Sequence, residues 1–119
     1  MRIVIFILML MLGAQAYAYQ TEASYYTRAS CLREGTSGIC ANGEKLDDGK
    51  KTCASWDYKF GTRLKVTNIE NGKYVIVRVN DRGPNKRLYR AGRRIDLSYA
   101  AMRAITTKGL CQVEVEEVK

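Results

Sequence analysis

The sequence predicts one small, mainly β domain with a single helix. Three observations support this class: segments in which apolar and polar residues alternate, glycine-rich breaks between them, and one alanine-rich stretch near the end. A chain of 119 residues has room for one domain. The clearest strand is 74–80, where every second residue is valine. Because Ile76 makes its second face partly apolar, we expect this strand inside a closed or covered sheet.

The remaining elements are assigned by the same patterns. Further strands are predicted at 23–27, 63–68, 95–97 and 110–118. The Asn71-Gly72 pair suits a type I′ turn, so 63–68 and 74–80 should pair antiparallel. The helix is predicted over 99–105, with Ser98 as its N-cap. Residues 28–48 carry many glycines and turn residues and should form a long loop.

The N-terminal segment predicts export. Arg2 precedes an apolar run over 3–12 that is too short to span a bilayer, which disfavours a membrane anchor. Small residues follow, and we expect cleavage after Ala18. The predicted organisation is therefore a signal peptide at 1–18 and a mature domain at 19–119. There is no cysteine near the cleavage site, so nothing in the sequence supports a lipid anchor. The expected location is therefore periplasmic or secreted.

Composition narrows the chemistry. The formal net charge is +8, but an exported chain is a poor candidate for binding nucleic acid. The absence of histidine removes the commonest general base and the commonest zinc ligand. Carboxylates are then the expected proton carriers, and we expect neither metal nor cofactor. The basic residues of 86–94 form either a site for an anionic wall polymer or a solvated face; they are Lys86, Arg87, Arg90, Arg93 and Arg94.

Four cysteines in a small exported domain predict two disulfides. Three pairings are possible, and the sequence alone does not choose among them. We favour Cys31–Cys53 with Cys40–Cys111, because the second bridge would tie the last strand to an early loop. A zinc site is disfavoured because no two cysteines have C-x-x-C spacing.

Asp81 is the leading candidate for chemistry. It ends the predicted strand 74–80 and precedes Arg82 and the turn dipeptide Gly83-Pro84. An acidic side chain at the end of a rigid strand is well placed for catalysis. The alternative, slightly favoured by these residues alone, is that Asp81 caps the turn and pairs with Arg82.

Four segments in order resemble the RlpA-like (rare lipoprotein A) family, which is related to expansin and barwin-like domains. They are Ala41-Asn42-Gly43-Glu44, Phe60-Gly61-Thr62, Val79 to Pro84, and Ile95-Asp96-Leu97-Ser98. The resemblance covers about 23–118 and implies a six-stranded double-psi β-barrel with an open groove. It also implies a monomeric, exported lytic transglycosylase whose partner is the glycan strand of peptidoglycan. Such enzymes cut the β-1,4 bond between N-acetylmuramic acid and N-acetylglucosamine and leave a 1,6-anhydro sugar.

The resemblance also assigns roles to residues. Asp81 matches the essential aspartate of the family and Glu44 its glutamate, and we expect Asp81 to be the acid. The family histidine falls at Ser55, which can hydrogen-bond a substrate but cannot shuttle protons at neutral pH. Asp96 is expected to be a turn or barrel hydrogen-bonding residue. The predicted substrate-binding residues are Ser55, Arg82 and three aromatic side chains that can stack on sugar rings, Tyr25, Tyr26 and Trp56.

The missing histidine leaves a second function open. A non-catalytic, expansin-like barrel that binds or loosens the wall would need the same groove but no proton carrier. A third, less favoured reading is a small secreted inhibitor on a disulfide scaffold. Release of anhydro-muropeptides from purified sacculi separates the first reading from the other two.

Overall fold

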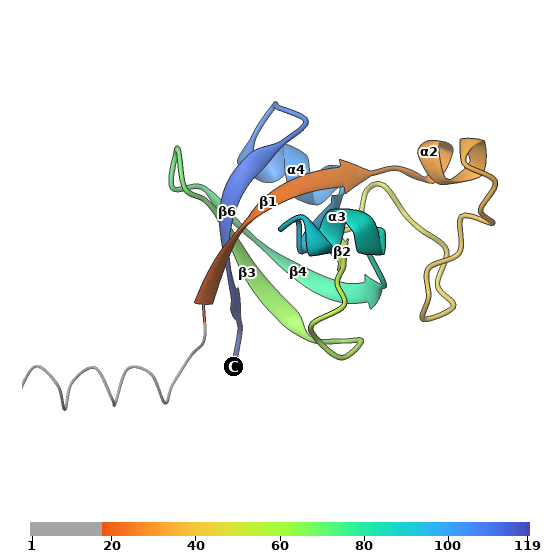
Figure 1. Ribbon diagram of the computed structural model, residues 1–119, viewed down its shortest axis with the longest axis horizontal. Coiled ribbons are helices and arrows are strands. Elements are labelled where there is room, and N and C mark those ends of the chain that lie inside the picture. The colour runs from red at the N-terminus through yellow and green to blue at the C-terminus, as the bar shows by residue number, and fades with distance from the viewer. Residues whose placement is uncertain (1–17) are drawn as a thin grey trace, which may run out of the picture.

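The computed structural model describes residues 18–119, which form a closed barrel of six strands (Figure 1). The predicted signal peptide lies outside these residues, except for Ala18, which begins the first strand. Around the barrel the strands follow the order β1-β5-β2-β4-β3-β6. Their bounds are β1 Ala18–Tyr26, β2 Thr52–Ala54, β3 Arg63–Asn68, β4 Tyr74–Asp81, β5 Ile95–Ser98 and β6 Cys111–Glu117.

The predicted alternation of β4 is confirmed. Val75, Val77 and Val79 point into the barrel and are buried, whereas Ile76 is half-buried on the outside. Strand β4 lies between β2 and β3, so it is internal to the sheet. The inward side chains of the other strands complete one apolar core: Ala23, Cys53, Leu64, Val66, Ile95, Leu97, Cys111, Val113 and Val115. Removal of these side chains from water is the main stabilising contribution of the barrel.

Two of the six strand pairings are parallel. Strand β1 runs parallel to β5, and β2 runs parallel to β4, whereas the other pairs are antiparallel. The pairing of β2 with β4 shifts register between Cys53 and Ala54, where β4 approaches its end at Asp81. A register shift of this kind bends a strand and redirects its side chains. The groove described below lies at this end of β2 and β4.

The β3–β4 hairpin confirms the predicted antiparallel pairing but corrects the turn. The connection is the loop 69–73, in which Gly72 has φ of 74° and no non-glycine residue has a positive φ. A type I′ turn requires a positive φ at both central residues, so Asn71 excludes it. Asn71 instead donates its side-chain N–H to the carbonyl of Ile105 and accepts from Lys73 N. These contacts fasten the hairpin tip to the end of α4.

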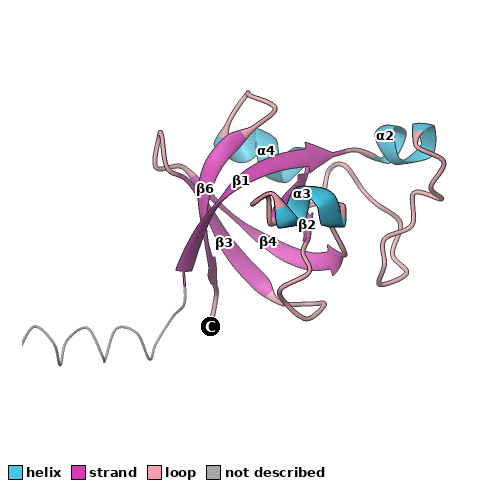
Figure 2. Ribbon diagram, viewed as in Figure 1, coloured by secondary structure: helices cyan, strands magenta, loops and turns pink. Residues whose placement is uncertain are grey.

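Within 18–119 the structure has three short helices, where the sequence predicted one (Figure 2). The predicted helix is α4 Tyr99–Ile105, which buries Ala101, Met102 and Ile105 and packs against β1, β4 and β5. The other two are α2 Arg28–Arg33 and α3 Lys86–Arg90. Both bury no residue and therefore have no apolar periodicity to detect. Their N-caps hold them: Thr27 with Ser30 in a capping box, and Asn85 at Leu88 N.

The predicted disulfides are not formed in the structure: all four cysteines are free thiols in the described chain. Cys40 lies near Asp81 and Glu44, whereas Cys111 lies near Glu70 and Lys108, where α4 connects to β6. Cys53 faces the core and is fully buried, whereas Cys31 is half-buried on α2. Sequence spacing alone could not show these surroundings.

Across 18–119, no helix has the length and apolar character needed to cross a bilayer.

Candidate functional site

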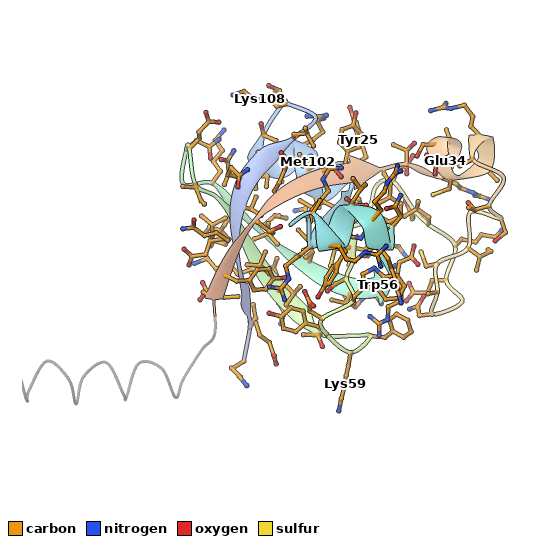
Figure 3. All side chains as sticks on the ribbon, in the orientation of Figure 1. Tyr25, Glu34, Trp56, Lys59, Met102 and Lys108 are labelled. Atoms are coloured by element: carbon orange, nitrogen blue, oxygen red, sulfur yellow. The ribbon has the colours of Figure 1, made fainter. Side chains whose placement is uncertain are left out.

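A groove with a volume of about 580 Å³ runs over the outside of the barrel. Its floor comes from β1, β5 and the ends of β2 and β4, and its walls come from α2 with the loop after it and from α3. Figure 3 shows Glu34 at the end of α2 on one side and Trp56 beneath α3 on the other. Both Asp81 and Asp96 line the groove. No group of three or more potential metal-ligating side chains occurs within 18–119.

Asp81 is held by three hydrogen-bond donors. Its Oδ1 accepts from Ala41 N at 2.8 Å and from Arg82 N at 2.9 Å. Its Oδ2 accepts from the Tyr26 hydroxyl at 3.3 Å. The backbone carbonyl of Asp81 accepts from Ser55 N at 3.0 Å, which fixes the strand end itself. Asp81 therefore caps its turn and also faces the groove.

The Arg82 side chain does not pair with the Asp81 carboxylate. Its guanidinium donates to the carbonyls of Ser55 at 2.7 Å and Tyr58 at 2.8 Å. The same group lies over the Phe60 ring, 3.9 Å from the centroid, which is a cation–π contact. Arg82 thus fastens the β2–β3 loop to the end of β4, although it also lines the groove.

Glu44 lies outside the residues that line the groove. Its two oxygens accept from Arg78 Nη1 and Nη2 at 2.7 and 2.8 Å, a bidentate ion pair. The Asn42 amide also donates to it. These hydrogen bonds, first of all that of Arg78, lower the pKa of Glu44 to about 2. A carboxyl group with so low a pKa is ionised at neutral pH and has no proton to donate.

Asp96 has a contrasting environment. It lies in β5 beside β1, and its Oδ1 accepts a hydrogen bond from the Ser24 hydroxyl of its register partner. Burial raises the pKa of Asp96, and the negative charge of Glu34 adds to the rise. The Ser24 hydrogen bond and Arg93 oppose it. The sequence marked Asp96 only as a hydrogen-bonding residue, because its burial depends on how β1 and β5 pair.

Ser55 is kept away from the groove. It is fully buried, and its Oγ accepts a hydrogen bond from Asp57 N at 3.0 Å. Its neighbours Ala54 and Trp56 line the groove, but Ser55 does not. Of the residues predicted to bind substrate, Ser55 alone does not line the groove.

The three predicted aromatic residues all line the groove. Tyr26 is half-buried, and burial followed by the charge of Asp81 raises the pKa of its hydroxyl, which stays a donor. Trp56 is 39% exposed and donates its indole N–H to the Pro84 carbonyl at 2.7 Å. The Lys86 ammonium lies 4.8 Å from the Trp56 ring centroid. Tyr25 lies at the end of β1 near α4.

The basic residues of 86–94 do not form one free patch. Arg93 pairs with Glu22 at 2.7 Å, and Arg94 pairs with Asp57 at 3.1 Å. The Arg94 guanidinium also lies over the Tyr19 ring, 4.3 Å from its centroid. Arg87 and Arg90 remain exposed on α3. Two of the five predicted residues are thus held in ion pairs, and only the exposed members of the cluster are available to a polyanion.

The closed barrel with its two parallel pairings defines the class: it is a double-psi β-barrel with two aspartates in its groove. Solved structures support the fold. The Streptomyces papain inhibitor superimposes with a TM-score of 0.63 at 22% identity, over 87% of this chain and 96% of the inhibitor. The expansin of Clavibacter michiganensis superimposes with a TM-score of 0.62 at 21% identity, over 87% of this chain and 51% of the expansin.

Sequence comparison identifies the family. The model of the lytic transglycolase family matches residues 18–116, so this chain belongs to that family. A probable endolytic peptidoglycan transglycosylase RlpA from a Nostoc species is 40% identical over 83% of this chain, and the RlpA of Pseudomonas aeruginosa is 38% identical over 88%. A similar protein of Treponema pallidum is 37% identical over 92%. The matches cover 25%, 29% and 32% of these relatives, respectively. The predicted RlpA-like resemblance and the double-psi barrel are confirmed.

Proposed function

We propose that this protein is an exported, monomeric lytic transglycosylase that acts on peptidoglycan outside the cytoplasm. It cleaves the β-1,4 bond between N-acetylmuramic acid and N-acetylglucosamine and leaves a 1,6-anhydro end. One observation carries the proposal: Asp81 and Asp96 line one groove but have different surroundings. Membership of the lytic transglycolase family supports the class of reaction.

Asp96 is the proposed acid. The reaction needs a protonated group that gives its proton to the leaving glycosidic oxygen as the C1–O bond breaks. The conjugate base then takes the proton of the C6 hydroxyl, whose oxygen bonds to C1 and closes the anhydro ring. The acid is regenerated and no water is consumed, so one carboxyl group serves both steps, unlike the two of glycoside hydrolysis. Burial raises the pKa of Asp96, which favours the protonated form that the first step requires.

Asp81 is proposed to stabilise the positive charge that develops on the sugar ring. Donors from Ala41, Arg82 and Tyr26 fix its carboxylate in the groove before substrate arrives. A preoriented negative group is effective where charge appears only in the transition state. This assignment departs from the sequence-based expectation that Asp81 is the acid, and it keeps Asp81 essential.

Glu44 and Arg82 are proposed as positioning residues. The Glu44–Arg78 ion pair holds the loop 41–44 against β4, and this loop supplies the Ala41 N–H that contacts Asp81. Arg82 holds the loop that carries Trp56 through the carbonyls on either side of it. Loss of either contact should shift the Asp81 carboxylate or the groove wall without removing a proton carrier.

The test is product chemistry with purified sacculi. Wild-type protein should release muropeptides with anhydro ends, detected by mass spectrometry, whereas Asp81→Asn and Asp96→Asn should not. Asp47→Asn makes the same chemical change in an exposed turn outside the groove and should retain activity. Absence of anhydro products with folded wild-type protein would overturn the proposal.

A second candidate is a non-catalytic, expansin-like barrel that binds or loosens the wall. The observation that favours it is Ser55, which stands at the position of the family histidine and is fully buried. Wild-type protein that binds sacculi and releases no anhydro product supports this candidate. Sacculus binding that survives Asp81→Asn and Asp96→Asn is expected under both candidates, so only turnover separates them.

A further inference from the structure

Tyr25, Tyr99 and Arg103 form a cluster at the α4 end of the groove. The two tyrosine rings meet edge to face, with centroids 5.6 Å apart and planes at 71°. The Arg103 guanidinium lies over both rings, 4.9 Å from the Tyr25 centroid and 5.2 Å from that of Tyr99. Tyr99 and Arg103 lie one turn apart on α4, so the helix presents both to Tyr25 on β1.

Arg103 is oriented but has no carboxylate partner within 18–119. Its Nη1 donates to the carbonyls of Thr106 at 2.9 Å and Lys108 at 3.1 Å, which fixes the plane of the guanidinium. By contrast, Arg78, Arg93 and Arg94 each form an ion pair. Nε and Nη2 of Arg103 make no hydrogen bond to the residues that the structure describes. The cluster therefore contains a guanidinium in a fixed orientation whose Nε and Nη2 can donate hydrogen bonds to a ligand.

Tyr25 connects this cluster to the proposed reaction centre. It lines the groove and directly follows Ser24, whose hydroxyl contacts Asp96. In Figure 3, Tyr25 lies by the α4 end of β1, whereas Trp56 lies beneath α3. Tyr99 is 43% exposed, so part of its ring is accessible beyond the groove. A glycan chain in the groove has an aromatic surface at each of these two places.

We propose that Tyr25, Tyr99 and Arg103 form a subsite for a sugar unit that carries a carboxylate. The apolar face of a sugar ring packs on the tyrosines, and the carboxylate accepts hydrogen bonds from the Arg103 guanidinium. In peptidoglycan this chemistry belongs to the muramyl unit, through its lactyl carboxylate or a carboxylate of its stem peptide. This inference rests on the proposed function for the identity of the polymer, but its test requires no turnover.

The test compares the binding of three tetrasaccharides to the full mature chain. Two alternate N-acetylmuramic acid with N-acetylglucosamine, one with free lactyl carboxylates and one with stem peptides; the third is neutral and contains N-acetylglucosamine alone. Each tetrasaccharide is titrated into the protein, and binding is measured by calorimetry. All proteins in this comparison carry Asp81→Asn, which prevents cleavage. The variants are Arg103→Gln and Tyr99→Ala, and the control is Arg63→Gln, which removes one exposed charge on β3. Backbone amide spectra check that each variant is folded.

Arg103→Gln should weaken binding of an acidic glycan about 10-fold, the effect of one charge-assisted contact, and leave the neutral glycan unchanged. Tyr99→Ala should weaken binding of all glycans that bind, because ring stacking does not depend on charge. Loss confined to the peptide-free glycan assigns the lactyl carboxylate, and loss confined to the peptide-bearing glycan assigns the stem. The subsite is overturned if Arg103→Gln weakens binding of acidic and neutral glycans equally, or weakens neither. It is also overturned if the Asp81→Asn protein, with Tyr25, Tyr99 and Arg103 intact, does not bind an acidic glycan more tightly than the neutral one. Absence of anhydro products with an intact acidic preference would instead refute only the proposed turnover.

Discussion

The two sides of the barrel are built differently. The β3–β4–β6 side consists of long antiparallel strands in continuous register, and every second residue points inward, most of them valines. On the groove side, β2 has three residues, its register shifts beside Asp81, and loops and short helices form the walls. The first side carries much of the apolar core, whereas the second holds carboxylates, arginines and half-buried aromatics. Under the proposed function, stability and chemistry therefore belong to separate parts of one small domain.

The sharpest test of this division is Asp96→Asn. The substitution keeps the size of the side chain and removes its proton, so activity on sacculi should fall about 10²- to 10⁴-fold. Wild-type activity should also decline as the pH rises through the raised pKa of Asp96, because the acid form is then lost. Mass spectrometry of released muropeptides over a pH series measures both effects. A variant with wild-type activity would show that another group donates the proton.

Substitutions on the β3–β4–β6 side should lower the stability of the fold and leave the activity of the folded protein unchanged. Leu64 is fully buried in β3, and Leu64→Ala should lower the free energy of unfolding by about 2–5 kcal/mol. Lys73→Ala in the exposed hairpin loop is the control and should change it by about 0.5 kcal/mol or less. Denaturant titration measures both. If Leu64→Ala lost activity at a temperature where it remains folded, the proposed separation of stability and chemistry would be incorrect.

Ser55→His restores the family residue at a fully buried position. The larger ring must displace its surroundings, so we expect a loss of about 1–3 kcal/mol in stability. If an imidazole at this position assists catalysis, release of anhydro sugar should rise in the folded fraction, and only when Asp96 is present. Thermal unfolding and product analysis are measured on the same samples. A stable variant would mean that the 55–57 turn can open and expose residue 55.

Glu44→Gln tests a contact that supports the groove without lining it. The folded-state pKa of Glu44 is about 2, below its ordinary 4.5, so its contribution is present above pH 4.5 and is lost as the pH falls toward 2. The variant should lack this part of the acid-induced loss of stability, and its activity should fall less than that of Asp96→Asn. Unfolding midpoints from pH 2 to 7 measure the first effect. Identical pH profiles for both proteins would contradict the role of the ion pair.

The smallest effect is expected from the exposed arginines of α3. Replacing Arg87 and Arg90 with alanine should weaken sacculus binding modestly at low salt and little at high salt, because exposed charges are screened beyond about 10 Å at 0.1 M. Pull-down at increasing salt concentration measures this. Arg93 and Arg94 are unsuitable for the comparison because their ion pairs belong to the structure. Binding that is independent of both salt and these residues would exclude an electrostatic contribution from α3.

The regular side could be predicted from sequence because its signals are local. Alternation located β3 and β4, and the alanine-rich stretch located α4 with its N-cap at Ser98. Asp81 can be identified as a candidate site residue from sequence because it ends a clear strand before a turn. These features depend on neighbours within a few residues.

The groove side could not be predicted as well because its properties depend on distant segments. The pKa of Asp96 depends on burial created by β1 and on the charge of Glu34. Ser55 is exposed or buried according to the β2–β4 register, which alternation over three residues cannot define. Helices α2 and α3 bury nothing, so only their capping residues could have indicated them. The positions of the cysteines likewise depend on the complete fold.

The position of β1 determines when this site can exist during folding. Strand β1 pairs with β5 and β6, so the earliest strand closes the barrel with the latest. Ser24 reaches Asp96 only after β5 has joined β1, and the barrel is complete only when residues up to 117 have added β6. Contacts between such distant segments make folding slow relative to a helical domain of the same size. A chain that still lacks β6 therefore contains every acidic residue of the groove but not the closed barrel that arranges them. We expect the proposed activity to begin only when the domain is complete.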